Sequence, residues 1–190
     1  MNRFSKKLVV FTLLCLCSTV CIAQNSLDNL DFEVARDGLP AYWYAGNGGI
    51  RNGNFKVTLD SLEKHSGKVS LKMEMLGVRD EKNFGVLTGT LPIELVAGKT
   101  VEFKGWIKTK EVKNGYAGLW FRVDGENRAI LGFDNMYDRG LTGTNDWTQV
   151  SIKMDVSKDV KNINFGGIFP GEGTVWFDDL ELFIDGVKYK

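Results

Sequence analysis

An alternating stretch near residue 120 carries the side chains best suited to hold a ligand. One face of a strand there would present Tyr116, Trp120, Arg122 and Asp124, because these residues share one phase of the alternation. An aromatic ring can stack on the C–H face of a sugar, while Arg and Asp can hydrogen-bond its hydroxyls. An apolar wall with a few placed polar groups is typical of ligand sites. The sequence therefore predicts carbohydrate binding on one sheet face.

Three further side chains extend this candidate binding site. Trp106 falls on the polar face of its own expected strand, between two lysines. Exposed tryptophans often mark interaction sites. Asp134 and Asn135 stand where a long, polar, glycine-containing segment begins, and residues 135–146 are expected to form a surface loop that could close over the same region.

The same residues also have a purely structural interpretation. If a loop covers this sheet face, Trp120 is ordinary core, since aromatic residues are mostly buried for packing reasons. Arg122 would then form a structural ion pair with Asp124 or Asp134. The sequence leaves both interpretations open.

Two segments at opposite ends of the chain place carboxylates among apolar side chains. Glu33 ends the first expected strand, and Asp178 and Asp179 lie in the last one. A buried carboxylate is costly unless it is paired, hydrogen-bonded or bound to a metal. We therefore expect the two ends to meet. The acids there could bind a structural calcium ion, which takes about six to eight oxygens, or could accept backbone N–H bonds at a bulge without an ion.

Most catalytic patterns are missing from the sequence. His65 is the only histidine and is expected to be an exposed loop side chain. There is no Gly-x-Ser-x-Gly elbow, phosphate-binding loop, His-Glu-x-x-His or EF-hand motif. A small hydrolase with two carboxylates stays open, because carboxyl separations are three-dimensional; its candidates are Asp124, Glu126, Asp134 and Asp138. We expect a binding module and no enzyme.

The elements that must position these residues are strands. Period-two alternation recurs along the chain, and turn residues separate the alternating runs; the clearest runs are 69–75, 101–108, 117–124 and 149–154. No convincing helical pattern occurs. Many short strands with turn chemistry between them predict an all-β fold, a two-sheet antiparallel β-sandwich or jelly roll.

The N-terminal segment has the features of an export signal. Basic residues precede an apolar run over residues 8–20, which is too short to span a bilayer comfortably, and small residues stand at the −3 and −1 positions before Gln24. We expect residues 1–23 to be a signal peptide and residues 24–190 to be a single domain. A lipoprotein anchor is the alternative, but Val20 and Leu16 are large residues before the two candidate cysteines.

Composition narrows the function classes further. All three cysteines lie in the expected signal, so no disulfide or thiolate chemistry is expected in the mature chain. Removing that signal takes away three of the 24 basic residues and none of the 24 acidic ones, which changes the formal charge from 0 to −3. No basic footprint for nucleic acid and no later membrane span is present. We expect an exported protein that is periplasmic, cell-surface or extracellular.

Five short motifs, taken in order, resemble the carbohydrate-binding modules with a galactose-binding-like jelly-roll fold. They cover nearly all of the expected mature chain; they are residues 29–33, 65–71, 103–109, 146–148 and 176–182. The resemblance implies an all-β jelly roll. It also implies a calcium site in many members, whose carboxylates would match Glu33 and Asp178, with Asp179 as a further candidate.

A second resemblance concerns residues 115–125 together with residues 133–140. They are similar to a jelly-roll domain at the front of secreted bacterial serine peptidases of the carboxyl-terminal-processing type and of erythromycin-esterase-like proteins. This resemblance adds an alternative to carbohydrate binding, namely a module that binds a protein or peptide partner in the cell envelope.

Overall fold

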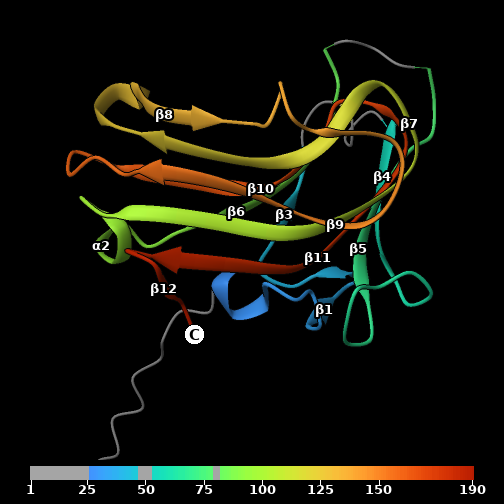
Figure 1. Ribbon diagram of the computed structural model, residues 1–190, viewed down its shortest axis with the longest axis horizontal. Helices are drawn as coiled ribbons and strands as arrows, with labels where there is room; N and C mark the ends of the chain where they lie inside the picture. Colours follow the sequence, from blue (N-terminus) through green and yellow to red (C-terminus); the bar gives the residue numbers. More distant parts are fainter. Residues whose placement is uncertain (1–25, 47–52, 79–81) are drawn as a thin grey trace, which may run out of the picture.

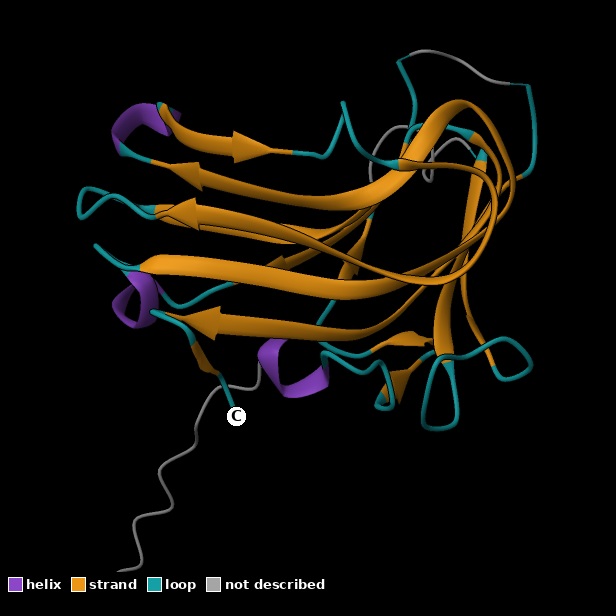
Figure 2. Ribbon diagram, in the orientation of Figure 1, coloured by secondary structure: helices purple, strands orange, loops and turns teal. Residues whose placement is uncertain are grey.

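The computed structural model describes residues 26–46, 53–78 and 82–190, and strands dominate this part of the chain (Figure 2). The signal peptide expected over residues 1–23 lies outside the described residues. No helix in the described part is long and apolar enough to cross a membrane. The predicted all-β class is confirmed.

The elements follow one another in this order along the chain. The strands are β1 (Ala35–Arg36), β2 (Leu39–Pro40), β3 (Tyr44–Ala45), β4 (Phe55–Asp60), β5 (Ser70–Met75), β6 (Gly85–Thr90), β7 (Thr100–Asp124), β8 (Ile130–Asp134), β9 (Leu141–Asp155), β10 (Asn162–Phe169), β11 (Glu172–Ile184) and β12 (Val187–Lys188). Three short helical segments, which the sequence did not predict, are η1 (Ser26–Asn29), α2 (Ile93–Val96) and η2 (Glu126–Arg128).

Strand β7 is 25 residues long and belongs to both layers of the sandwich (Figure 1). Its first part pairs with β11 and β9, and its second part pairs with β10 and β8. The first layer therefore has the order β4-β5-β11-β7-β9, and the second has the order β3-β6-β10-β7-β8. All pairings are antiparallel, and β12 adds to β11.

The chain bends sharply where β7 passes from one layer to the other. Glu111 and Asn114 have φ values of 53° and 52°, and the pairing with β9 and β11 shifts register there. On β11, Gly173 has a φ of 104°, and a Cβ at this position would lie 2.6 Å from the Glu111 carbonyl oxygen. Only glycine lets the two bent strands approach this closely.

The core fills the space between the two layers. Phe103, in the first part of β7, meets Phe165 of β10 edge to face, with ring centroids 5.0 Å apart. Trp43 contacts the same Phe165 ring at 5.3 Å. Ala117, Leu119, Phe121 and Val123 are all buried, as the alternation predicts. The side chains that alternate with these four in the second part of β7 therefore point to the outer face of the second layer.

The two ends of the described chain meet, as expected. The Leu180 N–H on β11 donates to the Leu30 carbonyl at 3.0 Å. Asn29, which is fully buried, holds the head segment in place: its side-chain amide donates to the carbonyls of Val34 and Ala41 at 2.9 Å each. Its own backbone carbonyl accepts the Trp43 indole N–H at 2.8 Å.

Candidate functional site

A hollow of about 270 Å³ opens on the outer face of the second layer, and we call it the Trp120 hollow. Its lining comes from β6, β7, β8 and β10 and the residue before β6; the lining residues are Phe84, Val86, Thr88, Trp120, Arg122, Phe133 and Ile168. The sequence predicted Trp120 and Arg122. It missed the other five, because they come from strands whose neighbours are fixed only by the tertiary fold.

The indole of Trp120 forms a fixed floor for this hollow. Its N–H donates to the Leu87 carbonyl of β6 at 3.0 Å, although β10 lies between β6 and β7. The residue opposite Trp120 on β10 is Gly166, so no side chain stands in the way of the ring. The indole therefore crosses β10 and is held at its far edge, while the residue keeps partial exposure.

Arg122 is the one charged side chain in the lining. Its Nε donates to Asp124 Oδ1 at 2.8 Å, and its side chain is 35% exposed. The predicted Arg122–Asp124 ion pair is present. Asp124 is 7% exposed and does not line the hollow. In this geometry its carboxylate holds the guanidinium, and Arg122 is the member of the pair that lines the hollow.

The remaining predicted residues of this strand and its loop lie outside the Trp120 hollow. Tyr116 is buried and packs edge to face against Tyr137, with centroids 6.1 Å apart; burial raises the pKa of its phenol to about 12. Asp134 pairs with Arg139 at 2.6 Å, and although burial acts in the opposite direction, this bond holds the pKa of Asp134 below its usual value. Asn135 accepts the Tyr137 N–H at 3.2 Å.

These bonds form a compact turn ahead of β9. The loop predicted for residues 135–146 was wrong at its second half, because β9 begins at Leu141. The strand carries polar residues there because its outward side chains are exposed at the bend. The turn is fastened to the Tyr116 side of β7, so it does not line the hollow.

Trp106 lies on the other layer, away from Trp120. It stacks on the His65 ring with centroids 4.1 Å apart and an angle of 16° between the planes. Trp147 meets the other side of this stack, edge to face with His65 at 5.7 Å. The expectation of an exposed loop histidine is confirmed, and its ring in addition contacts two indoles. One face of Trp106 is thus already occupied by protein.

The carboxylates at the two chain ends all bind the loop between β4 and β5. Asp178, which is 1% exposed, accepts the backbone N–H groups of His65 and Ser66 on one oxygen, at 2.7 and 3.2 Å. Its other oxygen accepts the Asp179 N–H at 2.8 Å. Asp179 in turn binds the His65 ring at Nδ1, at 2.6 Å, and the Ser66 hydroxyl at 2.9 Å.

Glu33 binds the next residues of the same loop from the head of the chain. Its Oε1 accepts the N–H groups of Lys68 and Val69 at 2.7 and 3.1 Å. A Cβ at Gly67 would lie 2.3 Å from this oxygen, and Gly67 has a φ of +61°. We call Glu33, Asp178, Asp179 and the loop over residues 61–69 the carboxylate clamp.

The donors in the clamp do not match the needs of calcium. The oxygens of Glu33 and Asp178 face N–H groups, whereas a calcium site gathers oxygen ligands around the ion. Within the described ranges, no group of three or more His, Cys, Asp or Glu side chains could hold a metal ion. The residues fit the alternative of backbone hydrogen bonding, and calcium binding stays a prediction.

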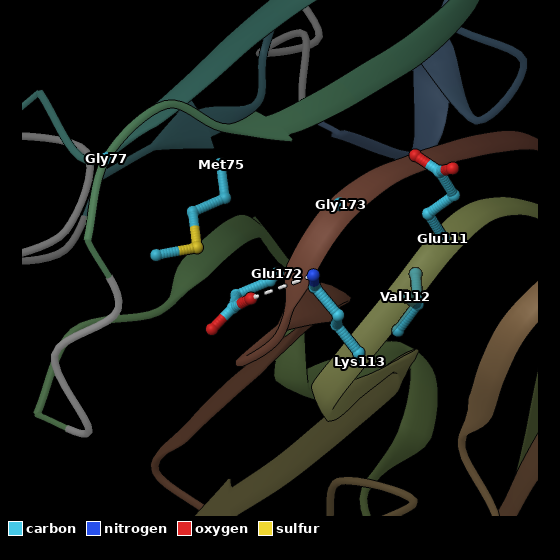
Figure 3. A pocket seen from close by; sticks show the side chains of 7 residues that line it. All are labelled: Met75, Gly77, Glu111, Val112, Lys113, Glu172 and Gly173. Atoms are coloured by element: carbon cyan, nitrogen blue, oxygen red, sulfur yellow. Dashed lines mark ion pairs between the residues drawn. The ribbon is translucent and has the colours of Figure 1, made fainter.

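A second hollow, of about 560 Å³, lies beside the bend of β7 (Figure 3). Its lining contains none of the predicted site residues; it consists of Met75, Gly77, Glu111, Val112, Lys113, Glu172 and Gly173. Lys113 and Glu172 form an ion pair at 3.8 Å, which the close view shows beside Met75. Glu172 neutralises Lys113 and leaves Glu111 as an additional acid, and none of the described lining residues is aromatic.

Comparison with known proteins establishes the fold and leaves the family open. No family model matches the chain. The chain is 35% identical over 126 residues to the uncharacterized HTH-type transcriptional regulator YbfP of Bacillus subtilis (strain 168). The match covers 66% of this chain, and the chain spans about two fifths (42%) of that regulator's length.

Several solved structures share the architecture. The CBM22-1 xylan-binding domain of Paenibacillus barcinonensis Xyn10C superposes with a TM-score of 0.60 at 15% identity, covering 84% of this chain and 93% of that domain. A second structure, described as a xylan-binding domain from CBM 22, gives 0.59 at 15% identity, with 82% and 92% covered. The MgGH51 α-L-arabinofuranosidase gives 0.56 at 18%, with 82% and 26% covered. The chain therefore has the jelly-roll fold of carbohydrate-binding modules. The likeness to peptidase-associated domains stays a prediction.

The clamp predicts different costs for two conservative substitutions. Glu33→Gln keeps the one oxygen that accepts both N–H groups, so we expect it to lower the free energy of unfolding by less than about 1 kcal/mol. Asp178→Asn must turn an NH₂ group towards a backbone N–H, because both Asp178 oxygens accept such bonds; we expect a loss of about 1–3 kcal/mol. Urea unfolding of both variants measures the difference, and equal costs would contradict this account.

Asp178 also predicts a pH dependence of stability. Burial raises its pKa from 3.8 to about 6, although the surrounding N–H groups act in the opposite direction. The folded state thus holds this proton more tightly than the unfolded chain, so the contribution of Asp178 to the free energy of unfolding increases as the pH falls from about 7 to about 4, by about 2 kcal/mol. The stability difference between the wild type and Asp178→Asn should grow accordingly.

The carboxyl ¹³C resonance of Asp178 provides the direct measurement, and its midpoint should lie near pH 6. A midpoint at or below the ordinary aspartate value would show that the N–H bonds outweigh burial.

The donor set of the clamp further predicts the response to calcium. Since a ligand that binds only the folded state raises the melting temperature, and the clamp oxygens already face N–H donors, we expect equal melting temperatures in EDTA and in excess calcium. Differential scanning fluorimetry checks this. A clear rise in calcium that Asp178→Asn removes would establish the ion.

Proposed function

We propose that the chain is a non-catalytic module that binds carbohydrate in the Trp120 hollow. The observation that carries this proposal is a fixed, partly exposed indole floor beside a guanidinium that uses only one of its nitrogens within the described protein. Solved structures with the same fold, described as xylan-binding domains, support it. We propose further that the chain is exported and acts in the periplasm, at the cell surface or outside the cell.

The hollow suits a sugar ring for three reasons. The Trp120 indole can stack under the C–H face of the ring, and the rings of Phe84 and Phe133 stand at its sides. Arg122 and the Thr88 hydroxyl can donate hydrogen bonds to the polar rim of the sugar. A volume of about 270 Å³ lies below the range of about 300–1,000 Å³ typical of drug-sized ligands, so it fits a single unit.

The positions of the four carboxylates that were candidates for a hydrolase favour a non-catalytic role for the chain. Asp124 is buried against Arg122, and Asp134 and Asp138 both pair with Arg139. Glu126 lies within 4.0 Å of Lys161. Among the residues that the structure describes, no carboxylate lines the Trp120 hollow, where an acid or a nucleophile would have to face the sugar.

A protein or peptide partner in the envelope is the second candidate, and one observation favours it. Strand β8 pairs only with β7 among the described strands and exposes Ile130 at 59%, Leu131 at 43% and Phe133 at 50%. An apolar edge strand can accept a strand from a partner. Phe133 belongs both to the Trp120 hollow and to the exposed edge of β8. Substitutions at Ile130 and Leu131 therefore distinguish the two functions, because these residues lie outside the hollow.

Substitutions in the hollow should weaken sugar binding without unfolding the module. We expect Trp120→Ala and Phe133→Ala each to lower the affinity for a bound oligosaccharide by about tenfold or more, because each removes an aromatic contact. Tyr137→Ala is the matched control, since this ring is 80% exposed and lies outside the hollow. Affinity gel electrophoresis on xylans and glucans, with isothermal titration on the best binder, gives the measurement.

If a glycan gel retards the wild type, and Trp120→Ala and Phe133→Ala are retarded to the same extent, the assignment of sugar binding to this hollow is overturned. If no glycan retards the wild type, and a protein partner that binds the wild type no longer binds Ile130→Ser and Leu131→Ser, the second candidate is established instead.

A further inference from the structure

We propose that the sugar unit held in the Trp120 hollow carries a carboxylate, as a uronic acid does, and that both Nη groups of Arg122 bind it. This inference rests on the proposed function and specifies the ligand of the same site. It follows from the donors of Arg122, from the rest of the lining and from the position of Asp124.

The donors of Arg122 are largely unused. Its Nε is bonded to Asp124, and no other hydrogen bond of this side chain occurs within the described residues. The two Nη groups therefore offer their N–H donors to a ligand. A guanidinium presents such donors as a rigid planar fork that matches a carboxylate with two parallel bonds.

The other walls of the hollow favour a ligand whose polarity is concentrated at one end. Among the described lining residues, Thr88 is the one polar side chain besides Arg122, and the others are apolar; they are Phe84, Val86, Trp120, Phe133 and Ile168. A neutral sugar has hydroxyls all around its ring and would bury several of them here without partners, which costs free energy. A uronate can lay its C–H face on Trp120 and direct its strongest acceptor to Arg122.

Asp124 makes this orientation possible without competing for it. It is buried behind Arg122 and takes the Nε side of the guanidinium, which fixes the plane of the fork. Its own backbone carbonyl is held by the Lys161 N–H at 2.7 Å, so the pair cannot easily shift. None of the described lining residues is a carboxylate, so within that lining an incoming anion meets only the Arg122 cation.

The test compares one polymer in two charge states. Glucuronoxylan and the same polymer after chemical reduction of its carboxyl groups are titrated against the wild type, Arg122→Lys, Arg122→Gln and Lys113→Gln. We expect the wild type to prefer the acidic polymer by about tenfold or more, and Arg122→Gln to abolish the preference. Arg122→Lys should retain a small part of it, because a lysine keeps the charge and loses the fork.

Lys113→Gln is the matched control. It removes one positive charge from an exposed position beside the other hollow and should leave the preference intact. If Arg122→Gln fails to fold because Asp124 is left unpaired, the double variant Arg122→Gln, Asp124→Asn removes both charges and keeps the comparison valid.

The outcomes separate this inference from the proposed function. If the wild type binds both polymers equally and Trp120→Ala binds neither, the inference of a carboxylate on the ligand is overturned, while sugar binding in the hollow stands. A preference that persists in Arg122→Gln, or that falls equally in Lys113→Gln, would show general surface attraction and overturn it as well. Binding of neither polymer, with no glycan retarding the protein, would remove the proposed function itself.

Discussion

The backbone N–H groups of one loop are bound by acids from both ends of the described chain, and these bonds tie the head segment and β11 to the β4–β5 connection. Residues 61–69 are held from the head by Glu33 and from the tail by Asp178, while Asp179 fixes the His65 ring. Each bond to an ionised acceptor is stronger than one between neutral groups, and each also satisfies a loop donor. The head segment, β11 and the β4–β5 connection thereby become a single unit.

This arrangement sets the position of everything on the first layer. The loop lies over the outer face at Trp106, and Glu63 reaches Lys108 on the same strand at 2.9 Å. The indoles of Trp106 and Trp147 are engaged with His65, so this aromatic group is a structural cover. On the outer face of the second layer, the described residues leave a hollow at Trp120. The open face and the covered face belong to the same strand, β7, on the two sides of its bend.

Alternation along the chain was enough to predict the long central strands and their phase, whereas the first expected strand, which Glu33 was to end, is η1 followed by a turn. It placed Ala117, Leu119, Phe121 and Val123 inside and Trp120 and Arg122 outside, and the structure has them there. It also predicted that the chain ends meet, because buried acids require partners. A local pattern can predict which side chains point inward, because the alternation of side chains between the two faces is a property of each strand alone.

Which residues line the Trp120 hollow depends on which strands pair with one another, and the sequence does not show these pairings. Trp106 and Trp120 are close in sequence and lie on the outer faces of different layers, because β7 bends at Glu111 and Asn114 between them. Phe84, Val86 and Ile168 join Trp120 only through the pairing of β6, β10 and β7. Asp124 turned away from the ligand side because its carboxylate is engaged by the neighbouring arginine.

The smallest residue on β10 has the largest influence on the shape of the open face. Gly166 leaves room for the indole to reach the Leu87 carbonyl, where a Cβ would itself lie only 2.1 Å from that oxygen. A Cβ at this point would meet the backbone of β6 at Leu87 and the Trp43 ring, so a larger residue would displace β6 and the carbonyl that holds the Trp120 indole. The position of the Trp120 indole thus depends on a missing side chain on the adjacent strand, and a single substitution at Gly166 would alter this face without changing any residue that lines the hollow.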